Sequence, residues 1–282
     1  MESTPKYVWI NNEIVPEALA TVGVSDLSIH RGYGIFDFFK IIDNRPIFID
    51  DHLNRFYRSA EAMNLDAGLD RRALKQAIHN LMEHNRLPDS AIKIILTGGY
   101  SADGYALGTP NLILIQTPFK MESPDYIQPM KLVTYQHQRQ LPAVKTIDYL
   151  QAILLRPFVK DNNADEVLYY YNNLITECPR ANFFLVTDDE IVTPKDNILA
   201  GITRSKVLQL PIENYRISER NITLNDIETA KEAFISSSTK NACAVIAIDG
   251  RPVGNGKPGK ITTLVSEKLT ELMLEQVYYQ KA

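Results

Sequence analysis

Residues 31–63 read RGYGIFDFFKIIDNRPIFIDDHLNRFYRSAEAM and predict a strand, a turn and a helix in succession. Ile35–Ile42 is rich in Phe and Ile, which favours a strand. Asp43–Pro46 predicts a turn that leads back into a short strand at Ile47–Ile49. From about Asp51 the apolar residues recur at the spacing of an amphipathic helix, at Leu53, Phe56, Ala60 and Met63.

The same alternation of strands and helices extends over the first 120 residues. Tyr7–Ile10 and Glu13–Val15 flank Asn11–Asn12 and predict a hairpin, because Asn tolerates the positive φ of a tight turn. Asp70 is the predicted N-cap of a second helix, whose apolar face carries Leu74, Ala77, Ile78, Leu81 and Met82. Further strands are expected at Ala91–Thr97, Asn111–Gln116 and Lys131–Tyr135.

Lys120–Pro129 is the best candidate for a linker, since it combines two prolines with a serine and mixed charges. We therefore expect two α+β domains, at residues 1–120 and 130–282, joined by 121–129. The second domain is predicted to contain a helix at Tyr149–Asn162, a short helix after Gly201 and a terminal helix from about Ile261. Its strands are expected at Glu166–Tyr171, Asn182–Val186, Ala233–Ser236 and Val245–Asp249.

Composition excludes several classes of protein. The 282 residues carry a net charge of −4, so no basic surface points to nucleic acid. The only cysteines, Cys178 and Cys243, do not form a disulfide framework, and no metal-binding motif occurs, so we expect no metal site. No apolar run reaches the roughly 18–20 residues of a membrane helix, and Met1–Ala20 lacks a signal-peptide pattern. The sequence predicts a cytoplasmic protein.

Two polar segments are candidates for anion binding. Gly201-Ile202-Thr203-Arg204 lies where a loop enters a helix, and free backbone N–H groups at such an end bind phosphate well. A plain helix start is the alternative. The run from Ser236 to Asn241 follows a strand and is either a second wall for an anion or a solvated turn. Motifs of serine hydrolases, zinc proteases and dinucleotide-binding loops do not occur.

Taken together and in order, the motifs of the chain resemble those of the class IV aminotransferases. The segments that carry this resemblance are Val24-Ser25-Asp26, Arg31-Gly32-Tyr33-Gly34-Ile35-Phe36, His52-Leu53-Asn54-Arg55, Lys145, Thr176-Glu177 and Gly201-Ile202-Thr203-Arg204. The resemblance covers about residues 7–275. It implies an α+β protein of the type IV pyridoxal-phosphate (PLP) fold, with a small α/β domain and a larger α/β domain built around a pseudo-barrel. It also implies a homodimer whose active site lies near the subunit interface.

The resemblance implies a role for each matching residue. Lys145 matches the lysine that forms the Schiff base with PLP and moves the substrate proton. Glu177 matches the carboxylate that pairs with the pyridine nitrogen, which lets the ring take up electrons. Arg55 matches the arginine of the phosphate site, and Ile202, Thr203 and Ser238 match its remaining donors. A non-catalytic relative is disfavoured because these groups are retained.

Departures from the family pattern leave the substrate open. Asn163-Ala164-Asp165-Glu166-Val167 lacks the tyrosine of many branched-chain enzymes and is closer to aminodeoxychorismate lyases and some D-amino-acid enzymes. Asp37 and Phe38 stand where those lyases tend to have threonines, which counts against the lyase. The loop Gly98–Tyr105 has neither the arginine nor the histidine with which the usual D-amino-acid enzymes bind a carboxylate.

Other residues are available to bind a substrate. Arg31, Arg180 and Lys240 are cations near the family motifs, Thr239 adjoins Ser238, and Phe36 suits an apolar side chain. This set is similar to a less common branch of D-amino-acid transaminases. We therefore expect a small D-amino acid, such as D-glutamate or D-alanine, with 2-oxoglutarate as the acceptor. Branched-chain L-amino acids are the alternative, followed by the lyase reaction.

Overall fold

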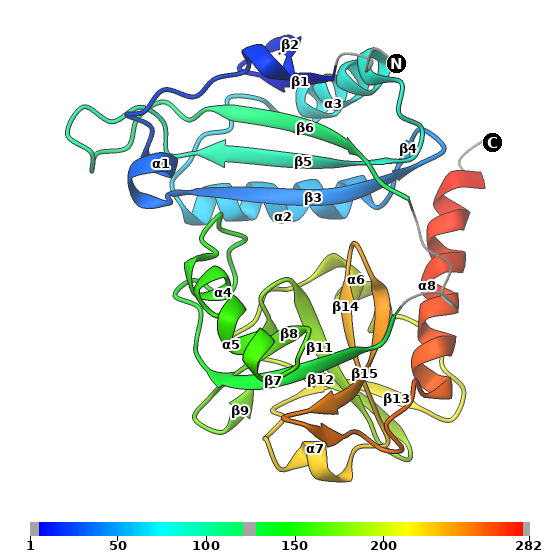
Figure 1. Cartoon of the computed structure of the whole chain (residues 1–282). Coiled ribbons are helices and arrows are strands. Elements are labelled where there is room, and N and C mark those ends of the chain that lie inside the picture. Colours follow the sequence, from blue (N-terminus) through cyan, green and yellow to red (C-terminus); the bar gives the residue numbers. More distant parts are fainter. Residues whose placement is uncertain (1–5, 121–127, 279–282) are drawn as a thin grey trace. The chain divides into compact units, whose positions relative to one another are not determined.

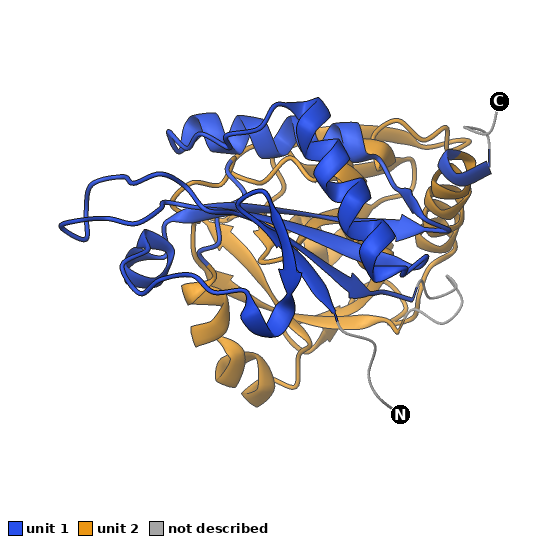
Figure 2. Cartoon of the chain, turned by 90° about the horizontal axis from the view of Figure 1, so that it is seen from above, with its two compact units in different colours: residues 1–121, 144–148, 276–282 blue, residues 122–143, 149–275 orange. Residues whose placement is uncertain are grey.

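The computed structural model describes residues 6–120 and 128–278. Contacts divide the chain into two compact units, shown in two colours in Figure 2. Unit 1 comprises Met1–Met121, Val144–Asp148 and Gln276–Ala282, and unit 2 comprises Glu122–Ala143 and Tyr149–Glu275. Residues 121–127 of the predicted linker lie outside the described residues, and the domain boundary stays a prediction.

Unit 1 is an antiparallel sheet with helices packed against it (Figure 1). The strand order is β2-β1-β6-β5-β3-β4, and β3 pairs with β5 along its length. The strands are β1 (Tyr7–Ile10), β2 (Glu13–Pro16), β3 (Gly34–Ile42), β4 (Arg45–Pro46), β5 (Ser90–Thr97) and β6 (Leu112–Pro118). The helices are η1 (Glu17–Leu19), α1 (Leu27–Arg31), α2 (Ile49–Ala62) and α3 (Arg71–Asn85).

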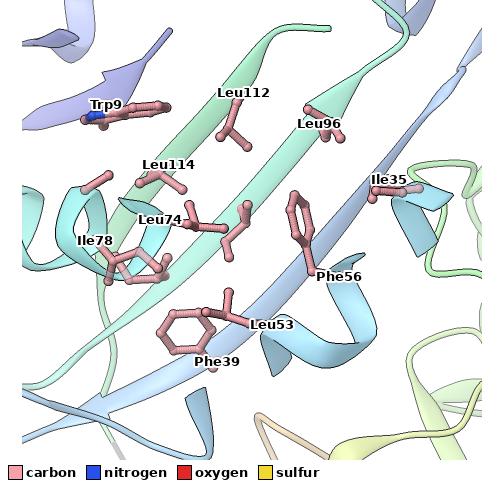
Figure 3. Close-up of a cluster of buried hydrophobic side chains, with 14 of the residues drawn as sticks. Trp9, Ile35, Phe39, Leu53, Phe56, Leu74, Ile78, Leu96, Leu112 and Leu114 are labelled. Carbon is pink, nitrogen blue, oxygen red and sulfur yellow. The ribbon is translucent and has the colours of Figure 1, made fainter. Parts of the chain in front are cut away.

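The core of unit 1 lies between this sheet and helices α2 and α3 (Figure 3). Leu53 and Phe56 of α2, Leu74 of α3 and Phe39 of β3 are completely buried. Burial of each such side chain stabilises the fold by about 1.5–3 kcal/mol. The apolar residues of α2 and α3 therefore face the sheet, and their spacing predicted both helices. Asp70 caps α3 as predicted, because its carboxylate accepts a hydrogen bond from the Ala73 N–H at 2.8 Å.

The predicted strand at Ile47–Ile49 is wrong. Ile41 and Ile42 of β3 pair with Pro46 and Arg45 of β4 directly beside the turn, and one further bond follows, from the Ile47 N–H to the Lys40 carbonyl at 2.9 Å. Phe48 then adopts a left-handed conformation, with φ of 52°, and α2 begins at Ile49. The hairpin at Tyr7–Ile10 and Glu13–Val15 is confirmed as β1 and β2.

Unit 2 contains a ten-stranded mixed sheet in the order β13-β12-β11-β14-β15-β7-β8-β9, with β10 and β16 paired beside it (Figure 1). The strands are β7 (Met130–Gln136), β8 (Glu166–Tyr171), β9 (Leu174–Ile175), β10 (Glu177–Cys178), β11 (Ala181–Val186), β12 (Glu190–Pro194), β13 (Arg216–Arg220), β14 (Glu232–Ser237), β15 (Asn241–Ile248) and β16 (Arg251–Pro252). The helices are α4 (Leu150–Leu154), α5 (Arg156–Asp161), α6 (Ile202–Val207), α7 (Asp226–Thr229) and α8 (Lys260–Tyr278).

The helix predicted at Tyr149–Asn162 is in fact two short helices, α4 and α5. Pro157 lies in the first turn of α5 and cannot donate to the carbonyl four residues before it, so the helix is interrupted at Leu155. The sequence did not predict β12 and β13, which pair in parallel from Glu190–Arg216 to Pro194–Arg220. Within the described residues, no helix is long and apolar enough to span a bilayer.

The segment Val144–Asp148 belongs to unit 1, although both flanking segments belong to unit 2. Its backbone is bonded to the start of β3, where the Phe36 N–H donates to the Lys145 carbonyl at 2.9 Å and the Ile147 N–H donates to the Gly34 carbonyl at 3.0 Å. A side chain at Gly34 would lie 2.8 Å from the Leu96 carbonyl oxygen, so this approach requires glycine. These bonds attach Lys145 to the sheet of unit 1.

Candidate active site

In unit 1, Lys145 lies between β3 and α2. Its Nζ is 4.6 Å from the centre of the Phe36 ring, a cation–π distance. Its backbone N–H donates to the Oγ of Ser59 at 3.3 Å. Lys145 is half-buried, whereas Ser59 is almost completely buried. The backbone of Lys145 is therefore fixed on both sides of its Cα, through its N–H to Ser59 and through its carbonyl to Phe36. Its amine lies against the Phe36 ring.

Arg55 lies on the same face of α2 as Ser59, one turn earlier, and its guanidinium is held by Asp37 of β3. Arg55 Nε donates to Asp37 Oδ2 at 2.8 Å, and Nη2 donates to Asp37 Oδ1 at the same distance. His52 Nδ1 is 2.7 Å from Asp37 Oδ1. All three residues are buried, with Asp37 fully so. Among the described residues, Nη1 of Arg55 makes no hydrogen bond, so this end of the guanidinium remains available.

Electrostatics defines the charge of this cluster. Burial alone would raise the pKa of Asp37, but the adjacent Arg55 and His52 outweigh it and hold that pKa well below its usual range. Burial lowers the pKa of His52 more than Asp37 raises it. His52 is therefore neutral at pH 7, and its Nδ1–H donates to the ionised carboxylate, which can only accept. Asp37 and Arg55 form a compensated buried ion pair.

In unit 2, Glu177 of β10 is buried and its two carboxylate oxygens have different partners. Oε1 accepts from Arg139 Nη1 at 3.0 Å. Oε2 accepts from the Leu199 N–H at 3.0 Å and from Asn182 Nδ2 at 3.4 Å. Asn182 Nδ2 also donates to the Leu199 carbonyl at 2.8 Å. Arg139, Asn182 and the Leu199 N–H together hold the carboxylate in one orientation.

The chain continues from Leu199 into Gly201, the N-cap of α6. Gly201 makes no side-chain cap bond, so the first-turn N–H groups of Ile202 and Thr203 have no partner within the helix. A side chain at Gly201 would collide with the Oδ1 atom of Asn182. A side chain at Gly201 would therefore displace Asn182, whose Nδ2 donates to Glu177 and to the Leu199 carbonyl.

The turn that follows β14 lies at the same end of the sheet as the turn before β11. Asn182 of β11 faces Ser236 of β14, and Arg180 lies in the turn just before β11. Ser238, Thr239 and Lys240 form the turn between β14 and β15. Ser236 Oγ is buried and, among the described residues, has no hydrogen-bond partner, which is unusual for a native structure.

Two predicted substrate residues already have partners. Arg180 Nη2 donates to Glu166 Oε2 at 3.1 Å, although about two thirds of the Arg180 side chain is exposed. Arg31 closes helix α1 of unit 1, and its Nε donates to the Gly104 carbonyl at 3.1 Å. Arg31 therefore stabilises the exposed loop that contains Gly104. Both Arg31 and Arg180 already donate hydrogen bonds within the protein.

Comparison with known proteins identifies the family. The model of the family "Amino-transferase class IV" matches residues 34–248, which is well over half of the chain. The chain belongs to the class IV aminotransferases. This class IV aminotransferase is 26% identical over 276 residues to the D-alanine aminotransferase of Bacillus licheniformis, covering 95% of this chain and 98% of the relative. It is 28% identical over 275 residues to a putative branched-chain-amino-acid aminotransferase of Methanocaldococcus jannaschii, covering 94% and 96%.

Solved structures show the same fold. A branched-chain amino acid aminotransferase from Escherichia coli superposes with a TM-score of 0.87 at 22% identity, covering 95% of this chain and 94% of that one. The branched-chain aminotransferase of Thermoproteus uzoniensis with norvaline gives a TM-score of 0.86 at 23% identity, covering 98% and 97%. The expected α+β fold of PLP fold type IV is thereby confirmed.

This class IV aminotransferase is a PLP-dependent enzyme, and its residues fit that cofactor. Unit 1 offers the amine of Lys145 and the available Nη1 of Arg55. Unit 2 offers a buried carboxylate at Glu177 and uncapped N–H groups at the start of α6. A phosphate needs the donors, and a pyridine nitrogen needs the carboxylate.

Sequence reasoning missed the residues that support these groups. In the sequence, Asp37 stands out only as a departure from the lyase pattern, and nothing singles out Arg139. One signal for Asp37 was available, since a carboxylate in the apolar strand Ile35–Ile42 must find a buried partner, and Arg55 was already a candidate. No local signal distinguished Arg139, which approaches Glu177 only after folding.

Proposed function

We propose that this PLP-dependent aminotransferase transfers an amino group between a small D-amino acid and a 2-oxo acid such as 2-oxoglutarate. The observation that carries the proposal is the common position of two basic turns. The turn that contains Arg180 and the turn that contains Ser238 and Lys240 both lie next to the Asn182–Ser236 pair, at one end of β11 and β14. Cations there suit carboxylates, because a buried carboxylate needs charged or N–H donors. Some relatives are named D-alanine aminotransferases.

The proposed cofactor contacts use donors that have no partner among the described residues of each unit. In unit 1, Nη1 of Arg55 would bind the phosphate, with Asp37 holding the guanidinium in place. In unit 2, the N–H groups of Ile202 and Thr203 and the hydroxyls of Thr203 and Ser238 would bind it as well. The phosphate contacts are charge-assisted, so each is worth about 1.5–3 kcal/mol.

The proposed chemistry assigns one task to each remaining residue. When bound, PLP supplies an electron sink for the pair left on Cα. Lys145 would carry the cofactor through its amine and move the proton at Cα. Glu177 would hold the proton on the pyridine nitrogen. Phe36 and Thr239 would line the substrate site, and Phe36 already contacts the Lys145 amine.

Binding of a substrate carboxylate by Arg180 would cost free energy, because Arg180 already donates a hydrogen bond to Glu166. A substrate carboxylate would replace Glu166 as the partner of Arg180. About two thirds of the Arg180 side chain is exposed, so it can turn without opening the core. Only 10% of the Glu166 side chain is exposed, so the exchange would leave a buried carboxylate without this partner, and the contacts of the substrate would have to offset that cost. Arg31 would assist by positioning its loop rather than as an unpaired cation.

The substrate test is a half-reaction screen. The PLP-loaded enzyme is mixed with D-glutamate, D-alanine, L-leucine and L-isoleucine in turn, and conversion of the cofactor is followed by its visible spectrum. We expect conversion with the D-amino acids. Fast conversion by the branched L-amino acids with none by the D-amino acids would reject the proposal in favour of a branched-chain enzyme. Release of pyruvate from aminodeoxychorismate without an amino acceptor would indicate the lyase reaction.

A second test concerns Lys145. Lys145→Ala should fold but form no borohydride-reducible link with PLP, and amino transfer should be nearly abolished. Arg251→Ala is a suitable control, since Arg251 is highly exposed and its nearest carboxylate is 3.8 Å away. Normal turnover of the Lys145 variant, or PLP trapped on another lysine, would exclude the assignment.

We also propose that the enzyme is a homodimer that uses helix α4. Leu150, Ile153 and Leu154 of this helix are 75%, 68% and 67% exposed, an apolar patch on a helix of five residues. Apolar patches of this kind mark protein interfaces. Sedimentation of the purified protein tests the assembly. The cytoplasmic location expected from the sequence stays a prediction, which cell fractionation would test.

A further inference from the structure

We infer that Arg139 is the positioning residue of the active site: its guanidinium holds the Glu177 carboxylate in the orientation used at the pyridine nitrogen. The inference rests on the proposed role of Glu177. Arg139 lies in the segment between β7 and Lys145, and about a fifth of its side chain is exposed. Most of its side chain is therefore shielded from solvent.

The guanidinium of Arg139 contacts both the Glu177 carboxylate and the backbone of its own loop. Nη1 donates to Glu177 Oε1 at 3.0 Å, and Nη2 donates to the Leu141 carbonyl at 3.2 Å. Nη1 also approaches the Pro142 carbonyl at 3.4 Å. The planar fork of an arginine can reach these acceptors together, whereas lysine is a single point charge. One side chain thus links Glu177 to the loop that leads into Lys145.

The opposite oxygen of Glu177 completes the orientation. Oε2 accepts from the Leu199 N–H and from Asn182, which in turn packs against Gly201 at the start of α6. A carboxylate with a different donor on each oxygen cannot rotate without breaking a bond. The donors all come from unit 2, so the orientation exists before any cofactor binds.

Charge makes Arg139 more than a packing residue. Glu177 is only 4% exposed, and a buried carboxylate without a cation is strongly disfavoured. Removal of one partner of such a pair leaves the other charge unpaired, which is the main cost of the mutation. We therefore expect the loss of Arg139 to be harmful only while Glu177 carries its charge.

The experiment is a double-mutant cycle with Arg139→Met, Glu177→Gln and the combination, measured first on the apoenzyme. Arg139→Met should lower the melting temperature by about 4 °C or more. The double variant Arg139→Met/Glu177→Gln should recover a substantial part of that loss. Arg139→Lys keeps the charge and should lie between wild type and Arg139→Met. Arg251→Met, an exposed arginine, is the matched control and should change neither stability nor activity.

The second measurement uses the loaded enzyme in single turnover. Arg139→Met should slow amino transfer by about tenfold or more without raising the substrate concentration for half-maximal rate, because it acts through Glu177. In an enzyme that already carries Glu177→Gln, adding Arg139→Met should slow amino transfer little further. The visible spectrum of bound PLP should shift in Arg139→Met towards that of Glu177→Gln.

Two results would overturn the inference in distinguishable ways. If Glu177→Gln slows transfer but Arg139→Met does not, Arg139 has no positioning role while the role of Glu177 stands. Additive stability losses in the cycle would likewise reduce Arg139 to a loop residue. If Glu177→Gln itself transfers at the wild-type rate, the proposed role of Glu177 fails and the inference falls with it.

Discussion

The buried ion pair between Asp37 and Arg55 predicts a specific loss of stability in Asp37→Asn. Asparagine keeps the shape but leaves the guanidinium of Arg55 without its carboxylate. Breaking a buried pair by removing one partner costs about 3–5 kcal/mol. For a domain of this size, 1 kcal/mol corresponds to roughly 2–4 °C, so the melting temperature of the apoenzyme should fall by about 6–20 °C.

Cofactor binding gives this prediction a second readout. In Asp37→Asn, the phosphate of PLP would supply the negative charge that Arg55 has lost. Added PLP should therefore raise the melting temperature of the variant more than that of wild type. Pyridoxal, which lacks the phosphate, should not produce this extra gain. Thermal unfolding with and without each ligand measures the effect.

The pH dependence has a definite sign. Because the pKa of Asp37 is held below its usual range in the folded protein, the ion pair stabilises the fold fully above about pH 4. This contribution is lost as the pH falls through the native pKa. The stability gap between wild type and Asp37→Asn should therefore be constant from about pH 6 to 8 and should narrow in strong acid.

Asp50→Asn is the matched control, since Asp50 forms an exposed ion pair with Lys75 at the start of α2. Its melting temperature should change by less than about 4 °C. Two results would contradict these roles of Asp37 and Arg55. Equal melting temperatures for the Asp37 and Asp50 variants would show that the buried pair does not stabilise unit 1. Equal gains from PLP in wild type and Asp37→Asn would remove Arg55 from the phosphate site.

Three further predictions concern other parts of the molecule. Gly201→Ala should weaken PLP binding to the apoenzyme at least about tenfold, because its Cβ would collide with Asn182 Oδ1; unchanged titration would contradict this. Glu166→Gln should release Arg180 and lower the D-glutamate concentration needed for half-maximal rate, with PLP affinity unaltered; an unchanged or higher concentration would argue against Arg180 as a substrate ligand. Ile153→Asp should dissociate the proposed dimer in sedimentation experiments, and an intact dimer would place the interface elsewhere.

Local patterns predicted most elements that carry their own signal. The helix after Asp70 has an apolar stripe and a side-chain cap, and the structure shows both. The strand at Ile35–Ile42 was predicted to within one residue of β3. Predictions failed where a single backbone constraint outweighed the pattern. Pro157 divided the helix expected at Tyr149–Asn162, and the left-handed Phe48 ended the strand expected at Ile47–Ile49.

The candidate site was predictable only as a set of residue types in the order of a known family. Lys145, Glu177 and Arg55 were assigned by resemblance, since nothing in their immediate neighbours distinguishes them from other charged residues. Their roles stay proposals. The family itself, the aminotransferase activity and the use of PLP are shown by the match over residues 34–248.

The apolar period of each element and the order of the motifs can be read from the chain alone; the period depends on neighbours a few residues apart. The pairing of the charges, in contrast, follows from the folded structure. Asp37 and Arg55 are 18 residues apart, and Arg139 and Glu177 are 38 apart, so no local pattern links them. Each pair forms because folding removes water from both groups, and a buried charge then needs the nearest opposite charge.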